Sequence, residues 1–521
     1  MTNDPKEFVR SSSSESSPRH EETEQDASPT TERRDRKKIG PVFAPLKTVD
    51  EIHQSAYTTQ EAAKEGLGTP QDQIPPVVRS LLELANVMMI GHSSKLRGCP
   101  GYQGGLFYGG KPFCIASGYR DSGSPMNMDN KENFIKLKDP LVYGELTIPI
   151  TATFLCQLHE EGVLDMERPL VEYLPDLGEK FDRLTARSIL QCKTTLDDAK
   201  ILKDCGAAPW KAYLSLNPCE SMQTNVYEPI NKFFAAGASH AVLNGQQQRS
   251  HLVQYLRTAG TSLPKPRSVT NLRSARTISH FSIALLVAAA ESQLQGVSFE
   301  DSIRKRLFEP CQCHAAGFGA PKVYRDPSDM FYKPSGLSLQ HQTFHTPVPQ
   351  GSLRNCAPPI FNGSLNLYAP VEDMAKLLLL SVDTLRNARD ALGPEPITAP
   401  HYDMGLWFDP VKCETSLRRN VFRGLDFLPS AAVFQYNAEY DVGVFSVSSC
   451  GTRNGRFFSN TFAKVLQHLY VKHIVEKGIN PNDSSDDPQA PKSETERKFS
   501  KMTKEREYKT VFKSHDAHRR F

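Results

Sequence analysis

The sequence predicts an α+β fold: an antiparallel sheet built from both ends of one domain, flanked by helices and carrying a helical lobe. Two observations lead to this prediction. Segments with the apolar pattern of strands occur near residues 104–119 and again at 432–448. Between them lie long segments whose apolar residues recur at helical spacing. Strand pairs separated by helices in this way favour a sheet whose two halves come from opposite ends of the domain.

The first half of the domain is predicted to contain two helices and one hairpin. Helical spacing of apolar residues predicts a helix over Val77–Met89. The run Gly104–Tyr119 has two β-rich stretches around Gly109-Gly110, which is typical of a hairpin. A second helix is expected over about Ile150–Glu161, with Gly162 as the residue that ends it.

The second half alternates helices with a closing hairpin. Apolar helices are predicted over Ile278–Leu294 and Val371–Val382, strands over Ala432–Tyr436 and Val442–Ser448, and a last helix over Ser459–Val471. A helical lobe inserted between the two halves of the sheet leaves a cleft at their junction, where ligand sites tend to lie.

Composition divides the chain into four parts. Residues 1–40 are rich in Ser and charged residues and have few large apolar side chains, so a disordered tail is expected. A linker is predicted over 41–74, the folded domain over 75–478, and a polar, basic tail over 479–521.

Charge and hydropathy exclude several classes of partner. Lys and Arg number 62 against 59 Asp and Glu, so no overall field attracts nucleic acid, and none is expected as a partner. No apolar stretch reaches the roughly 20 residues of a membrane span. The charged, Ser-rich start does not resemble a secretory signal. We therefore expect an intracellular, cytoplasmic protein.

The cysteines predict neither disulfides nor a metal site. The chain has 11 Cys, scattered and without paired CxxC spacing, which is typical of reduced thiols in an intracellular compartment. The cluster Cys311-Gln312-Cys313-His314 lacks a second cluster at metal-site spacing, so we interpret it as buried or half-buried thiols. No cofactor and no metal are expected.

Five segments resemble segments of one enzyme family, in the family's order and over about four hundred residues. They are Ile150–Leu177, Leu184–Leu196, Ser298–Cys311, Gly363–Lys376 and Leu428–Ser448. The family is the serine β-lactamase and penicillin-binding-protein superfamily, and the resemblance is to class C β-lactamases and their eukaryotic relatives. It implies the β-lactamase/transpeptidase-like fold.

The resemblance also places the family's first motif on residues that lack its chemistry. That motif is Ser-x-x-Lys at the start of a buried helix, where the Lys amine takes the proton of the Ser hydroxyl one turn away. Here the Ser position falls on Glu145 and the Lys position on Ile148. Isoleucine cannot accept a proton, so this resemblance implies a degenerate active site.

The other two motifs are replaced as well. The Tyr-x-Asn motif falls on Ile278-Ser279-His280, and the Lys/His-x-Gly motif falls near Arg423-Gly424 and Asp426. A displaced Ser-x-x-Lys at Ser302 and Lys305 lies on an amphipathic helix far along the chain, and we interpret it as a chance match.

Two interpretations of Glu145 stay open at this stage. Its carboxylate is expected to cap the N-terminus of the following helix, where negative charge is favourable. Alternatively, Glu145 and His280 face each other across the former cleft as an acid and base or as two metal ligands.

Three functional hypotheses follow. The leading one is a pseudoenzyme, a non-catalytic scaffold or binding module that acts through a protein partner or through self-assembly. The second is a hydrolase of the β-lactamase, esterase or peptidase type with a rewired active site. The third is a sensor that binds a small-molecule ligand in the former cleft without turnover.

Overall fold

The computed structural model describes the chain in segments between residues 77 and 472. They are 77–86, 101–108, 111–118, 135–207, 227–235, 244–259, 279–319, 330–332, 347–349, 357–391, 401–403, 406–409, 414–416, 431–437, 442–448 and 453–472. All of them belong to the second of two units into which the chain divides, residues 43–521. The predicted tails and the linker over 41–74 lie outside the described residues.

A seven-stranded antiparallel sheet, the central sheet, has the strand order β2-β1-β12-β11-β10-β9-β8. Its strands are β1 (Gly101–Tyr108), β2 (Lys111–Gly118), β8 (His401–Asp403), β9 (Leu406–Asp409), β10 (Glu414–Ser416), β11 (Ala431–Asn437) and β12 (Val442–Ser448). β1, from the start of the domain, pairs with β12, from its end, and Tyr102 lies opposite Ser448. The predicted α+β class and the sheet built from both ends of the domain are therefore confirmed.

The pairing of β1 with β12 depends on close packing at one glycine. A Cβ atom on Gly443 would lie 2.2 Å from Cδ2 of Phe107. The Phe107 ring stacks on Phe445, with ring centroids 5.3 Å apart. Every residue of β12 is buried, because helices cover both faces of the sheet at this strand.

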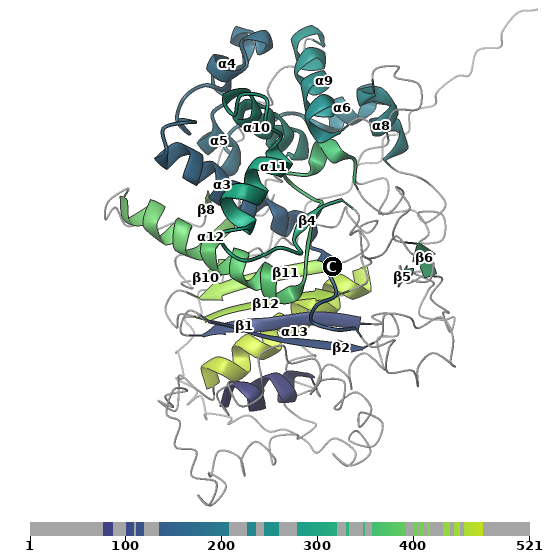
Figure 1. Cartoon of the computed structure of the whole chain (residues 1–521), viewed down its shortest axis with the longest axis vertical. Coiled ribbons are helices and arrows are strands. Elements are labelled where there is room, and N and C mark those ends of the chain that lie inside the picture. Colours follow the sequence, from purple (N-terminus) through teal and green to yellow (C-terminus); the bar gives the residue numbers. More distant parts are fainter. Residues whose placement is uncertain are drawn as a thin grey trace, which may run out of the picture. The chain divides into compact units, whose positions relative to one another are not determined.

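Helices cover both faces of the central sheet (Figure 1). One face packs against α13 (Arg453–Tyr470) and the helix over residues 77–86, and together they form the smaller apolar core. The other face packs against α12 (Val371–Ala391), which also contacts α3 (Thr147–Glu160). This second face belongs to the larger core, which continues into the helical lobe.

The helical lobe is formed by the helices between α3 and α12. They are α4 (Leu170–Tyr173), α5 (Ala186–Leu190), α6 (Asp198–Asp204), α8 (Glu228–Phe234), α9 (Gly245–Thr258), α10 (His280–Gln293) and α11 (Phe299–Ile303), the last followed by a π-helical turn, η8 (Arg304–Phe308). A small sheet of β3 (Leu141–Val142), β7 (Leu367–Ala369) and β4 (Gly317–Phe318) brings the start of α3 beside the residues that precede α12.

A buried arginine joins three helices of the lobe to one loop. The Nε and Nη2 atoms of Arg249 on α9 donate to the Glu291 carboxylate on α10 at 2.9 and 2.6 Å. Nη2 also donates to both carboxylate oxygens of Glu300 on α11 at 3.1 Å, and Nη1 donates to the Pro359 carbonyl at 3.3 Å. Burial lowers the pKa of Arg249, whereas the hydrogen bonds and charges of Glu291 and Glu300 raise it, and the net direction is upward.

The observed elements differ from the predicted ones mainly at their ends. α3 begins at Thr147 rather than near Ile150, because Pro149 in the first turn is not required to donate a helical hydrogen bond. α12 continues to Ala391 and α13 begins at Arg453, so both helices exceed their apolar segments. The short strands β8, β9 and β10 were not predicted. No helix in the described part of the chain has the length and apolarity needed to cross a membrane.

The arginine cluster gives a stability prediction. Arg249→Met should lower the free energy of unfolding by about 3–5 kcal/mol, because two carboxylates lose the cation that compensates their burial. Arg168→Met is the matched control: Arg168 pairs with Asp165 and Glu172 on the surface, and its loss should cost less than about 1 kcal/mol. Urea denaturation measures both variants, and equal effects would contradict the role assigned to Arg249.

Candidate functional site

Glu145 lies on a short 3-10 turn, η4 (Gly144–Leu146), immediately before α3. Gly144 has a φ of 58°, in the left-handed region that glycine adopts at low cost. The Thr147 hydroxyl donates to the Gly144 carbonyl at 2.5 Å and accepts from the Leu367 amide at 3.1 Å. The turn is therefore attached to β7, and it also contacts β11 of the central sheet.

His280 is the first residue of α10, and a polar cap fixes its position. Ser279 caps the helix by accepting from the Ser282 amide at 2.9 Å. The Asp198 carboxylate on α6 accepts from the Ser279 hydroxyl and from the His280 amide, the latter at 3.1 Å. The imidazole ring of His280 contacts the Phe361 ring edge-on, and the two ring centroids lie 6.0 Å apart.

Glu145 and His280 form a buried pair. His280 Nε2 lies 3.1 Å from Glu145 Oε1, and both side chains are about 5% exposed or less. At this distance the two side chains form an ion pair when the imidazole is protonated. The predicted helix cap is wrong: the N-cap residue of α3 is Leu146, no side chain caps it, and the carboxylate pairs with an imidazole on another helix.

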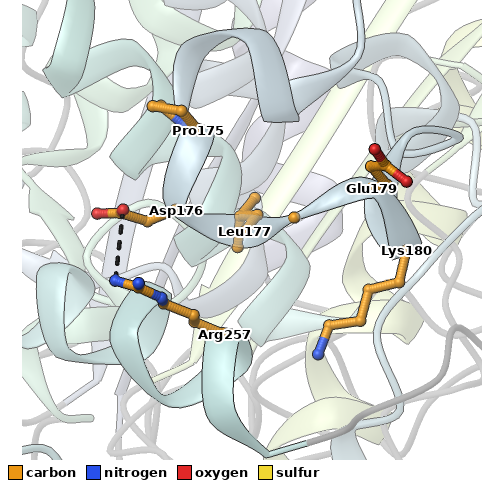
Figure 2. A pocket seen from close by; sticks show the side chains of 7 residues that line it. Pro175, Asp176, Leu177, Glu179, Lys180 and Arg257 are labelled. Atoms are coloured by element: carbon orange, nitrogen blue, oxygen red, sulfur yellow. Dashed lines mark ion pairs between the residues drawn. The ribbon is translucent and has the colours of Figure 1, made fainter.

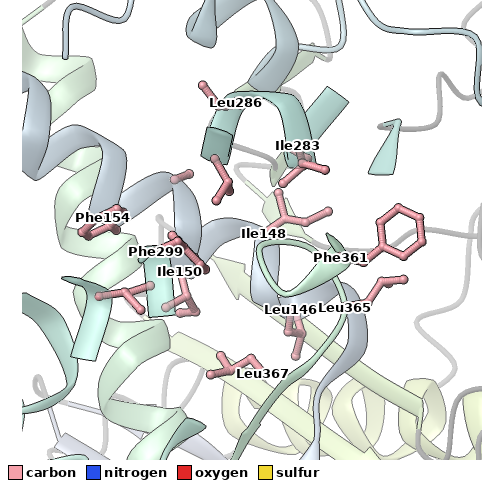
Figure 3. Packing of buried hydrophobic residues seen from close by; sticks show 14 of the residues in the cluster. Leu146, Ile148, Ile150, Phe154, Ile283, Leu286, Phe299, Phe361, Leu365 and Leu367 are labelled. Carbon is pink, nitrogen blue, oxygen red and sulfur yellow. The ribbon is translucent and has the colours of Figure 1, made fainter. Parts of the chain in front are cut away.

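Ile148, which the sequence resemblance matched to the family's lysine, belongs to the apolar core. Its side chain is fully buried. Figure 3 shows it among Leu146, Ile283 and Phe361, with Leu365 and Leu367 nearby. The η4 turn thus presents a carboxylate to His280, and the next turn contributes an alkyl side chain to the core.

The remaining predicted site residues are not all described. Ile278, Arg423, Gly424 and Asp426 lie outside the described residues. In the displaced Ser-x-x-Lys sequence, Ser302 is buried on α11 and Lys305 is exposed on η8.

Comparison with known proteins identifies the family. The family model for Beta-lactamase matches residues 90–409, which is more than half of the chain. The chain belongs to the β-lactamase family. The predicted resemblance to the serine β-lactamase and penicillin-binding-protein superfamily is confirmed, and so is the predicted α+β fold. No curated protein matches the sequence.

Solved structures of similar fold come from several members of this broad group. The octameric penicillin-binding protein homologue from Pyrococcus abyssi is 16% identical with a TM-score of 0.49, covering 77% of this chain and 78% of that one. D-Amino acid amidase from Ochrobactrum anthropi SV3 is 14% identical with a TM-score of 0.49, covering 75% and 99%. Class C β-lactamase from Rhodobacter sphaeroides is 13% identical with a TM-score of 0.45, again covering 75% and 99%. At these identities the likeness concerns the fold alone.

The cysteine cluster of this β-lactamase-family chain is described and carries free thiols. Cys313 is buried and Cys311 is half-buried. Burial, reinforced by the charges of Asp373 and Cys311, raises the pKa of Cys313 to about 12. Burial also raises the pKa of Cys311, against the opposing effect of Lys376. Among the described residues, no group of three or more His, Cys, Asp or Glu side chains could hold a metal ion.

Sequence reasoning missed two contributors to the Glu145–His280 pair. Asp198 precedes the residues it contacts by about eighty positions, and no motif distinguishes it from a surface acid. Phe361 ends a 3-10 helix of only three residues, η10 (Pro359–Phe361), which is too short for a detectable periodic pattern. The Ser279 cap had a detectable signal, because a Ser directly before an apolar helical run is a typical N-cap.

The buried pair predicts a strong energetic coupling. Glu145→Ala should lower the free energy of unfolding by about 2–4 kcal/mol, because the buried His280 loses the carboxylate beside it and a cavity is left. Glu145→Gln should cost less, since a side chain of the same size still fills the space beside His280. A double-mutant cycle with His280→Ala, followed by chemical denaturation, measures the coupling. Additive effects of the two alanine substitutions would mean that the contact contributes nothing.

Proposed function

We propose that this β-lactamase-family chain is a pseudoenzyme that serves as a non-catalytic scaffold or binding module. One observation carries the proposal: the residue matched to the family's nucleophile is a buried glutamate held by His280. The residue matched to its lysine base is the buried Ile148.

The chemistry of acyl transfer supports this proposal. A nucleophilic hydroxyl needs a neighbouring base, and Ile148 has no atom that accepts a proton. The Glu145 carboxylate already faces an imidazole at 3.1 Å. A fully buried site among apolar side chains also favours packing over the admission of a polar substrate.

The same contact defines a second candidate, a hydrolase with a rewired active site. A carboxylate beside an imidazole at 3.1 Å is the arrangement in which Glu145 would orient His280 as a general base. The hydrolase hypothesis requires a substrate to reach His280, whose exposed fraction is 3%, and for that reason we rank it second.

Turnover assays test the proposal directly. The full chain should neither hydrolyse a chromogenic cephalosporin or p-nitrophenyl ester nor become labelled by a fluorescent penicillin, with an active class C β-lactamase assayed in parallel. Stoichiometric acylation of any Ser would refute the pseudoenzyme. Ester turnover that Glu145→Gln or His280→Ala abolishes would establish the rewired hydrolase instead.

Restoring the first motif tests how much of the site is lost. Glu145→Ser combined with Ile148→Lys should not regain hydrolysis, because Tyr-x-Asn is replaced by Ile278-Ser279-His280 and the new amine would enter an apolar core. Thermal melts of the double variant, with Glu145→Ser alone as control, identify loss of folding. Turnover by the folded double variant would show that the rest of the active site is competent.

The binding role requires its own measurement. Affinity purification of the intact chain and of a version lacking residues 1–40 and 479–521, compared by mass spectrometry, tests whether partners depend on the tails or on the domain. We expect at least one partner to be retained by the domain alone.

A further inference from the structure

A second candidate site lies on the helical lobe, apart from Glu145. A pocket of about 400 Å³ is lined by residues 175–180 and by Arg257, in the last turn of α9. The charged residues that line it are exposed on the surface, whereas Glu145 and His280 are buried. The volume is within the range of small-molecule sites.

Two buried side chains fix the segment that lines the pocket. Two 3-10 turns, η5 (Pro175–Leu177) and η6 (Glu179–Phe181), follow each other around Gly178, whose φ is 76°. Leu177 and Phe181 are buried and anchor the turns in the core, with exposures of 1% and 0%. The segment therefore presents Asp176, Glu179 and Lys180 outward from a fixed backbone.

Two carboxylates, Asp176 and Glu179, and two cations, Lys180 and Arg257, line this pocket (Figure 2). Arg257 Nη1 lies 3.6 Å from Asp176 Oδ1, which is longer than a hydrogen bond, and both side chains are about two-thirds exposed. Such a pair contributes little to stability and separates at low cost. In Figure 2, Arg257 and Lys180 extend along opposite sides of Leu177.

We propose that this pocket binds a small zwitterion of about the size of a dipeptide. Its carboxylate would meet the guanidinium of Arg257, whose paired N–H groups match a carboxylate, and the Lys180 ammonium would attract it from the other side of Leu177. Its ammonium would meet Asp176 and Glu179. Because the four lining charges sum to zero, a ligand with both charges is favoured over a simple anion or cation.

Ligand-detected NMR titration of the full chain tests this proposal with alanyl-leucine as the probe. Saturable binding is expected with a Kd near the millimolar range. N-Acetyl-alanyl-leucine and alanyl-leucine amide each lack one charge and should bind about fivefold more weakly, since an exposed charge contact contributes about 1 kcal/mol. Equal binding of all three compounds would overturn the proposal.

Substitutions of pocket residues test whether alanyl-leucine binds in this pocket. Arg257→Ala and Lys180→Ala should each weaken alanyl-leucine binding about fivefold, whereas Arg183→Ala, an exposed arginine of the same lobe outside the pocket, should leave it unchanged. Absence of saturation at 10 mM probe, or equal effects of Arg257→Ala and Arg183→Ala, would refute the site. Glu145→Gln should bind like the parent chain, so this result is independent of the proposed pseudoenzyme.

Discussion

The helical lobe depends on one fully buried guanidinium. Arg249 satisfies Glu291 and Glu300 at once, so α9, α10 and α11 meet around a single cation. Glu291 in turn accepts from the Phe299 amide at 2.9 Å, and Glu300 accepts from Asn362 at 2.7 Å. A buried ionic cluster of this kind is costly to desolvate and even more costly to break, so its members are mutually dependent.

This cluster also determines the surroundings of the Glu145–His280 pair. The Pro359 and Ile360 backbone is bound by Arg249 and Gln248, which fixes the loop that carries Phe361. Phe361 packs against His280, and the Gly363 carbonyl accepts from Thr151 on α3. This segment thus places apolar side chains beside the Glu145–His280 pair.

The sequence predicted the elements with strong patterns and missed those defined by distant partners. The hairpins at 104–119 and 432–448 have apolar strands on either side of a turn, so they were recognisable locally, whereas β8, β9 and β10 have three or four residues each. The prediction that the family's first motif falls on Glu145 and Ile148 came from the family resemblance. The direction of the Glu145 side chain did not, because it depends on His280, far along the chain. Arg249 has the local pattern of a surface residue, and its carboxylate partners alone account for its burial.

The adjacency of β1 and β12 has a consequence for how the protein is made. Tyr102 on β1 pairs with Ser448 on β12, so most of the domain must be synthesised before these two strands can pair. At about 5–20 residues per second this interval is on the order of tens of seconds. During this interval β1 is paired with β2 on one side only, and the backbone N–H and C=O groups that later bind β12 have no strand partner. On the ribosome, the edge of β1 is therefore available for association with other chains until β12 has been made.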